Sequence, residues 1–247
     1  MSQTIGRCEL THLERAEIDV SRARAQHEAY EAALAALGCQ VERVAGAAHL
    51  PDSVFIEDTA VVLDELGIVA RPGAESRQME VEGIAAALSR YRPIERIVAP
   101  ATLDGGDVLR VGRVLYVGVS GRTNQDGVRQ LAQYAAPFGY QTLAVERLGG
   151  CLHLKSAATQ ADDGVLLINP AWIDGAAFGR LTCIDVDPGE PYAANVLRIG
   201  RRVLCAASAP RTRARLAARG VDTVAVDVSE LAKAEGALTC CSVIVWR

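Results

Sequence analysis

The sequence predicts a single α/β domain over residues 1–247, built as a five-bladed propeller of ββαβ units with pseudo-five-fold symmetry. The first observation is internal repetition. Similar strand starts recur at offsets of 48, 47, 41 and 45 residues, beginning at Glu57, Gly105, Leu152, Ala193 and Leu238. A period of this length is typical of repeat arrays and propellers. The second observation is that the fifth repeat is incomplete, which predicts that the two ends of the chain share it.

The elements follow from local patterns. A first helix is expected over residues 18–37, where alanine and leucine are abundant, apolar residues recur at helical spacing and Gly38 provides a stop. Further helices are expected over 75–90, 124–136 and 211–219, with a weaker pattern over 170–180. Apolar and β-branched runs predict strands over 40–44, 54–62, 67–70 and 94–99, and the same order of elements restarts at Asp104.

The last ten residues, LTCCSVIVWR, have the composition of a buried strand, because Val243, Val245 and their neighbours are apolar, β-branched or aromatic. A strand at the end of a chain needs a partner. We expect residues 238–246 to pair with residues 5–10, which would close the ring and leave no open edge. The alternative is a stacked α/β array in which the candidate residues below are scattered.

Composition limits the function. The net charge of −4 gives no basic stripe for a phosphate backbone, so nucleic acid is not an expected partner. No apolar run approaches the roughly 20 residues that cross a bilayer, and no basic and apolar leader precedes the first helix. The expected location is therefore the cytoplasm, without a membrane partner. Seven cysteines without CxxC spacing favour free thiols over a disulfide framework or a structural zinc site. A homodimer is an open alternative to a monomer.

Three residues could form a nucleophilic centre. Cys240 stands at the entrance of the last predicted strand, where loops often mount catalytic groups. His153 occupies a repeat position close to that of Cys240, and a thiol beside an imidazole is an activated nucleophile. Asp104 precedes Gly105 and Gly106, where the backbone can bend and the carboxylate could orient His153. The alternatives are a small buried cysteine, a core histidine and a turn aspartate.

Four further charged residues describe a binding pocket. Glu57 and Asp58 lie inside an apolar predicted strand, and burying two carboxylates is costly unless cations or donors meet them. Side chains of adjacent strand residues point to opposite faces. Arg77 and Arg122 each follow a predicted hairpin, where a guanidinium could bind a carboxylate with two hydrogen bonds, although each alone would be a surface arginine. Together they suit a zwitterion with a cationic tail.

Six segments carry a family resemblance. They are residues 55–62 (FIEDTAVV), 71–77 (RPGAESR), 103–108 (LDGGDV), 120–125 (SGRTNQ), 152–156 (LHLKS) and 238–243 (LTCCSV). The chain resembles dimethylarginine dimethylaminohydrolase over nearly its whole length. That family belongs to the guanidino-group-modifying (pentein) superfamily of five-bladed α/β propellers, the architecture that the internal period predicts independently.

The resemblance implies a role for each candidate residue. Cys240 would be the nucleophile, His153 the general acid and base, and Asp104 the third catalytic residue. The substrate would be a small guanidino amino acid, bound at its guanidinium by Glu57 and Asp58, at its α-amino group by Asp52, at its α-carboxylate by Arg77 and Arg122, and at a short lid over residues 8–15 by Leu10. No cofactor and no metal take part in the implied chemistry.

The implied reaction is hydrolysis of Nω-methylated L-arginine to L-citrulline and an alkylamine, through a covalent S-alkylthiouronium on Cys240. Relatives that deiminate free arginine typically have an aspartate where this chain has Lys155, and a second carboxylate facing the guanidinium would favour an unsubstituted group. Lys155 therefore predicts a preference for methylated arginines. An arginine deiminase, or a hydrolase of another modified guanidine, is the alternative, and a non-catalytic binding propeller is a more distant one.

Overall fold

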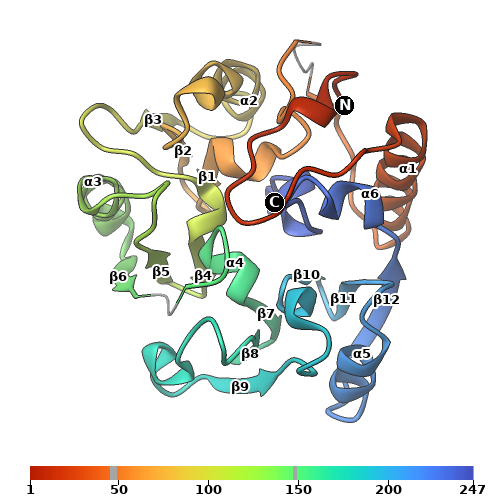
Figure 1. The fold of residues 1–247 in the computed structure, drawn as a ribbon. Helices are drawn as coiled ribbons and strands as arrows, with labels where there is room; N and C mark the ends of the chain where they lie inside the picture. The colour runs from red at the N-terminus through yellow and green to blue at the C-terminus, as the bar shows by residue number, and fades with distance from the viewer. Residues whose placement is uncertain (45–48, 147–148, 247) are drawn as a thin grey trace.

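Four three-stranded sheets form most of the protein in the computed structural model, which describes residues 1–44, 49–146 and 149–246. Within each sheet the first two strands form an antiparallel hairpin, and the third strand runs parallel to the second. Figure 1 shows the sheets grouped around the middle of the molecule. The strands are β1 Ala60–Val62, β2 Gly67–Val69, β3 Ile94–Arg96, β4 Val108–Val111, β5 Val114–Gly118, β6 Gln141–Val145, β7 Ala158–Asp162, β8 Val165–Ile168, β9 Thr182–Asp185, β10 Leu197–Ile199, β11 Arg202–Ala206 and β12 Asp222–Val226.

A parallel pair needs a crossover, and helices supply it in three sheets. These helices are α2 Val81–Leu88, extended at its start by the 3₁₀ turn η3 Glu75–Glu80, α3 Gln125–Ala135 and α5 Pro210–Ala217. The predicted helices over 75–90, 124–136 and 211–219 are thereby confirmed. The weaker pattern over 170–180 forms only the 3₁₀ turn η6 Gly175–Phe178. The repeating α/β architecture is present in these four units.

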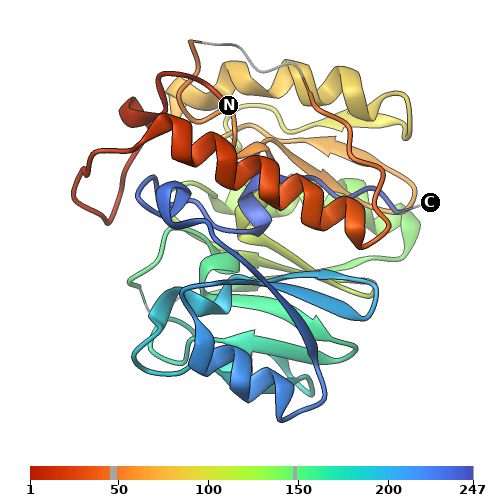
Figure 2. The same ribbon diagram turned by 90° about the vertical axis from the view of Figure 1, so that its right-hand side faces the viewer.

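The first predicted helix is α1, Val20–Ala36, and it lies along the outside of the molecule (Figure 2). The Asp19 side chain caps it by accepting a hydrogen bond from the N–H of Arg22. The predicted strand over 40–44 is wrong, because these residues have no sheet partner within the described chain. Four of the five are exposed, so little apolar burial holds them in a sheet.

The recurring positions predicted as strand starts are helical turns instead. They are η2 Ile56–Thr59, η4 Gly105–Asp107, α4 Leu154–Ala157, η7 Pro191–Ala194 and η8 Thr239–Cys241. The units approach too closely there for extended chain: a Cβ on Gly105 would collide with the carbonyl oxygen of Glu57. Glu57, His153 and Cys240 are therefore not strand residues.

These five turns meet around the centre. Contacts join η2 to η4, η4 to α4, α4 to η7, and η8 back to η2. Between η7 and η8, the Asn195 side chain donates to Thr239 Oγ1 (2.9 Å) and accepts from the Thr239 N–H (3.0 Å). Residues far apart in sequence are thus brought together on one central cluster of turns.

The two ends of the chain meet by side-chain packing and not by strand pairing. Residues 5–7 form the 3₁₀ turn η1, whose hydrogen bonds Arg7 N–H to Thr4 and Cys8 N–H to Ile5 use groups that a ladder would need. Within the described chain, residues 242–246 belong to no sheet, and Arg247 lies outside it. The predicted pairing of the termini is therefore wrong. Instead, Ile5 and Cys8 share a core cluster with Leu238 and Cys241.

Helix α1 reinforces this junction of the ends. It packs against β12 and against α6, Ser229–Ala232, the short helix that precedes the last turn. None of the described helices is both long and apolar enough to cross a lipid bilayer.

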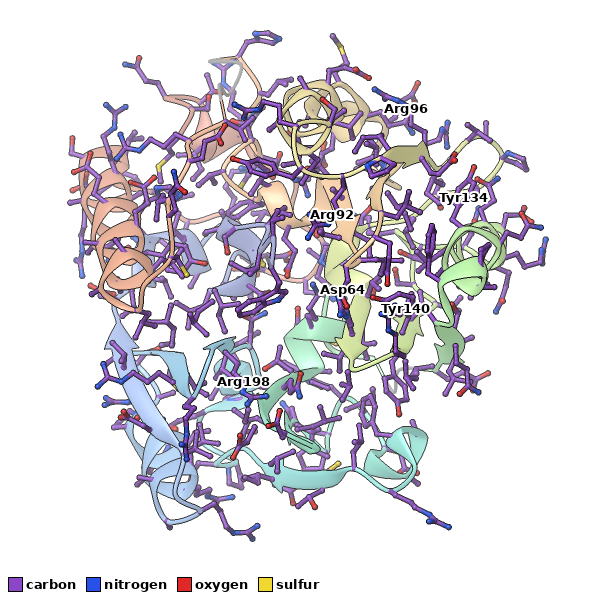
Figure 3. The ribbon with its side chains drawn as sticks, turned by 180° about the vertical axis from the view of Figure 1, so that it is seen from behind. Asp64, Arg92, Arg96, Tyr134, Tyr140 and Arg198 are labelled. Atoms are coloured by element: carbon purple, nitrogen blue, oxygen red, sulfur yellow. The ribbon has the colours of Figure 1, made fainter. Side chains whose placement is uncertain are left out.

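Polar contacts join neighbouring units on the face seen in Figure 3. Asp64 accepts hydrogen bonds from Arg110 (2.7 Å), and its own N–H donates to the Tyr140 hydroxyl (3.3 Å). The Tyr134 hydroxyl donates to the carbonyl of Arg96 (3.0 Å), which ties α3 to β3. These contacts are on the opposite side of the molecule from the segment before α1, which crosses the front of the centre in Figure 1.

Candidate active site

A small cavity under the segment before α1 collects most of the predicted site residues. Cys240, from η8, and His153, from the residue preceding α4, both line it. Asp52, Asp58, Arg77 and Arg122 line the same cavity. Asp104 lies directly behind His153, whereas Leu10 and Glu57 are not part of the lining. The central turns have therefore brought together side chains that span 189 residues of sequence from Asp52 to Cys240, counted inclusively.

His153 is held between two carboxylates. Its Nε2 lies 3.0 Å from Asp104 Oδ2, and its Nδ1 lies 3.6 Å from Asp58 Oδ1. Burial lowers the pKa of His153, but the charges of Asp58 and Asp104 outweigh burial and raise it to about 9. The ring is consequently an imidazolium at neutral pH, with a proton ready to be given to a leaving group.

Two further contacts fix this arrangement. The Asp104 N–H donates to Thr123 Oγ1 (3.1 Å), and Asp104 Oδ1 accepts from the N–H of Gly73 (2.9 Å). The N–H of Leu154, next to His153, donates to Asp107 Oδ1 (2.9 Å). Asp107 therefore positions the backbone beside His153 and is not part of the cavity lining.

Of the two adjacent cysteines, only Cys240 lines this cavity. Burial, followed by the charges of Glu57 and Asp58, raises the pKa of the Cys240 thiol well above its ordinary value. Burial likewise raises the pKa of Cys241 to about 12, and its thiol donates to the carbonyl of Ala237 (3.5 Å). Cys240 is thus a protonated thiol at neutral pH unless a cation enters the cavity.

Arg77 is buried, and each of its three side-chain nitrogens has a protein partner. Nη1 donates to Asp58 Oδ2 (2.5 Å), Nη2 to the carbonyl of Phe55 (2.9 Å), and Nε to Glu80 Oε2 (3.0 Å). Burial raises the pKa of Asp58, but His153 and Arg77 more than offset burial and keep Asp58 ionised. Burial dominates at Glu80 and raises its pKa to about 7. The local sequence could have indicated Glu80, which follows Arg77 by three residues on a helical turn.

Glu57 faces away from the cavity of Cys240. Its Oε1 accepts from Lys155 Nζ (2.5 Å) and its Oε2 from Thr239 Oγ1 (2.6 Å). Burial raises the pKa of Glu57, although Lys155 opposes that effect. Glu57 and Lys155 both line a second, larger cavity of about 480 Å³, whose lining contains neither a cysteine nor a histidine. The larger cavity therefore lacks a nucleophile and a proton donor of the kind found beside Cys240.

Three side chains of the site are of the types that bind metal ions. Asp58, Asp104 and His153 offer ligand atoms within 4.8 Å of one another, the only such group within the described residues. The same atoms already exchange hydrogen bonds or ion pairs among themselves and with Arg77. A buried imidazolium between two carboxylates suits proton transfer.

The segment over residues 8–15, the predicted lid, lies in the stretch before α1 that crosses the front of the centre in Figure 1, and its Glu9 lines the cavity. The N–H of Glu9 donates to Asp52 Oδ2 (3.2 Å), and Arg122 Nη2 donates to Thr11 Oγ1 (3.1 Å). Leu10 is half-buried and packs against the core cluster of the chain ends. The closed cavity has about 20 Å³, close to the roughly 10–15 Å³ that one water needs. An amino acid can enter only if this segment moves.

Comparison with known proteins places the chain in a family. A scan against protein-family models finds no match. A dimethylarginine dimethylaminohydrolase of Streptomyces coelicolor is 42% identical over 236 residues, which cover 95% of this chain and 90% of that protein. This chain belongs to the dimethylarginine dimethylaminohydrolase family. The family member from Pseudomonas aeruginosa is 36% identical over 91% of this chain and 89% of its own length.

Solved structures agree with this membership. The P. aeruginosa dimethylarginine dimethylaminohydrolase, as a cysteine-to-serine mutant in complex with citrulline, matches with a TM-score of 0.92 at 33% identity, over 97% of this chain and 94% of that one. An amidinotransferase of Microseira wollei, at 17% identity, covers 92% of this chain and 84% of its own with a TM-score of 0.83, which shows a shared fold. The prediction of a hydrolase of this family, acting on C–N bonds of amidines, is confirmed.

Proposed function

We propose that this protein hydrolyses Nω-methylated L-arginine to L-citrulline and an alkylamine. The observation that carries the proposal is the cavity lined by Cys240 and His153, with Asp104 behind the imidazole and Asp58 beside it, in a member of this family. A nucleophile, a proton donor and a fixed anion are the groups that displacement at a guanidinium carbon requires.

The first half-reaction begins with the substrate cation. Its guanidinium is stabilised by the Asp58 carboxylate and offsets the negative field that raises the pKa of Cys240, so the thiol gives its proton to solvent. The thiolate attacks the guanidinium carbon and forms a C–S bond. The C–N bond to the alkylated nitrogen breaks, and His153 gives its proton to the departing amine. An S-alkylthiouronium on Cys240 remains.

The second half-reaction restores the enzyme. His153, now neutral, takes a proton from a water molecule that attacks the thiouronium carbon. The C–S bond breaks and the Cys240 thiolate leaves. The second proton of the attacking water passes to solvent, so the carbon keeps the oxygen as the ureido C=O of citrulline, and the thiolate regains a proton from solvent when the product departs. Asp104 holds the imidazole in place through both proton transfers, since its Oδ2 lies 3.0 Å from Nε2.

The other end of the substrate is assigned to residues near the lid. Asp52 is proposed to bind the α-amino group. Arg122 is proposed to bind the α-carboxylate, since the one hydrogen bond of its guanidinium within the described residues goes to the Thr11 hydroxyl. Arg77 was expected to share that role, but its nitrogens are engaged, so we assign it mainly to holding Asp58. Leu10 is proposed as a lid contact, and Glu57 as a support for the Cys240 turn through Thr239.

The architecture proposed for this function is one domain forming a five-bladed propeller. Four blades correspond to the sheets, and the fifth is assembled from residues 242–246, α1 and residues 40–44. Support comes from the contacts that join the five central turns in a ring and from the core cluster that Ile5 and Cys8 share with Leu238 and Cys241.

The proposed substrate preference rests on Lys155. Because its ammonium neutralises Glu57, Asp58 is the carboxylate left to meet the guanidinium from within the cavity. One substrate nitrogen can then be fully hydrogen-bonded while the other carries methyl groups. We expect kcat/KM to be higher for asymmetric dimethylarginine and monomethylarginine than for arginine, measured side by side as citrulline release. Arginine as the best substrate would move the assignment to the deiminases.

A further inference from the structure

Glu235 makes an unusual contact with the lid. Its carboxylate accepts hydrogen bonds from three consecutive backbone N–H groups: those of Thr11 (3.0 and 3.1 Å), His12 (2.5 Å) and Leu13 (2.7 Å). Successive N–H groups that converge on one anion form an anion-binding concavity. Here the anion is a side chain more than 220 residues further along the chain.

The local structure around Glu235 favours another residue type. Among the described residues, Glu235 is the only non-glycine residue with a positive φ, of 56°. It follows the end of α6, where its N–H donates to Ala232 and the N–H of Gly236 donates to Leu231 (3.0 Å). Glycine is preferred in this left-handed position at a helix end. A carboxylate near a helix C-terminus is also unfavourable electrostatically. The hydrogen bonds that offset these two unfavourable features of Glu235 are those to the lid.

Glu235 differs from the other lid contacts in what it must do during turnover. Asp52 and Arg122, which hold Glu9 and Thr11, are the groups proposed to bind the substrate's amino and carboxylate ends. A bound substrate would compete with the lid for both. The hydrogen bonds to Glu235 come from backbone N–H groups only, and they can persist when the substrate is present.

We propose that Glu235 is a positioning residue that fastens residues 11–13 and so holds the lid closed over the bound substrate. The proposal rests on the function proposed above, and it assigns Glu235 no contact with the reacting atoms. Charge-assisted hydrogen bonds of this kind are the stronger ones. Their loss in Glu235→Gln should raise KM roughly ten-fold while changing kcat much less, because a Gln side chain offers one neutral acceptor.

A measurement that needs no turnover tests the lid directly. The rate of Cys240 alkylation by iodoacetamide, and the rate of tryptic cleavage after Arg15, should each rise several-fold in Glu235→Gln, because both report opening of the lid. Glu14→Gln is the matched control, because it also replaces a glutamate by glutamine. Glu14 lies in the exposed part of the lid, and its carboxylate makes no hydrogen bond within the described structure. The KM, alkylation rate and cleavage rate of Glu14→Gln should equal those of the wild type.

A second variant separates positioning from stability. Glu235→Gly relieves the positive φ and removes the carboxylate, so its melting temperature should equal or exceed that of the wild type while KM and Cys240 alkylation rise as in Glu235→Gln. Unchanged KM and alkylation in both variants would overturn the proposal, as would a fall in melting temperature that alone accounts for the lost activity. If the wild type hydrolyses no methylarginine, the proposed function fails, whereas alkylation and cleavage still decide the role of Glu235.

Discussion

His153 Nε2 lies 3.0 Å from Asp104 Oδ2, and this contact joins the turn before α4 to the turn at Gly105 across the centre of the molecule. With Asp58 on the other ring nitrogen, it keeps the imidazole protonated at neutral pH, since the pKa of His153 is raised to about 9.

Asp104→Asn should lower the pKa of His153, because an amide replaces the carboxylate that stabilises the imidazolium. With the proton donor weakened and the ring less well oriented, kcat should fall roughly 100-fold while KM changes little. NMR titration of His153 and steady-state kinetics measure the two effects. A variant with wild-type kcat would remove Asp104 from the catalytic group.

The same pair predicts how stability depends on pH. Folding raises the pKa of His153 from 6.5 to about 9, so its stabilising effect is complete below pH 6.5 and is lost as the pH rises through 9. Between pH 6 and pH 10 the wild type should lose about 3 kcal/mol more unfolding free energy than His153→Gln. Urea denaturation at both pH values gives the comparison. Equal losses would contradict a raised pKa.

Ionisation of Cys240 should depend on the substrate. Burial and the charges of Glu57 and Asp58 raise the thiol pKa in the free protein, and a bound guanidinium cation opposes those charges. A non-reactive arginine analogue should therefore lower the apparent pKa, followed as thiolate absorbance in the wild type minus that of Cys240→Ser. No shift at saturating analogue would rule out substrate-assisted ionisation.

Lys155→Met should destabilise the protein by about 3 kcal/mol, because it leaves the Glu57 carboxylate buried without its cation. The side chains of Lys155 and Glu57 are only 17% and 9% exposed. Lys233→Met is the control: Lys233 also pairs with a buried glutamate, Glu230, but the Lys233 side chain is 36% exposed and Glu230 keeps a second cation, Arg22, at 3.9 Å, so the loss should stay below about 1 kcal/mol. Chemical denaturation of both variants tests the difference, and equal losses would contradict it.

Arg77 and Arg122 should respond differently to lysine. Arg77→Lys cannot reproduce the contacts to Asp58, Glu80 and Phe55, so it should lose stability by about 2–3 kcal/mol together with activity. Arg122→Lys should keep its melting temperature and show a raised KM, because only a substrate carboxylate would lose a bidentate partner. Thermal melts and kinetics of the pair decide whether the two arginines share one role.

The period of the repeats located the central turns but predicted the wrong conformation for them. Ala60–Val62 is apolar and contains two β-branched valines, so the pattern extended the strand back through Glu57 and Asp58. The helical turn is imposed by close packing of neighbouring units, as at Gly105 against the carbonyl oxygen of Glu57. Local residue patterns carry no information on how closely two units pack. For the same reason the sequence predicted that the two termini pair as strands, whereas in the structure they meet through side-chain packing.

The candidate site was predictable where residue types are chemically distinctive. Cys240, His153 and Asp58 line one cavity with Asp104 behind them, as the motifs indicated. The pairing of Lys155 with Glu57 and the engagement of Arg77 by Glu80 depend on burial and on contacts across the fold. Glu235 belongs to no motif, and its partners lie at the other end of the chain.

The most direct test is formation of citrulline and dimethylamine from asymmetric dimethylarginine by the wild type, Cys240→Ser and Cys241→Ser. Both cysteines have free thiols and are neighbours in the sequence, but only Cys240 lines the cavity with His153, so Cys241→Ser is the matched control. We predict that the wild type and Cys241→Ser form both products, and that Cys240→Ser forms neither. Turnover undiminished in Cys240→Ser, or none in the wild type, would contradict the account.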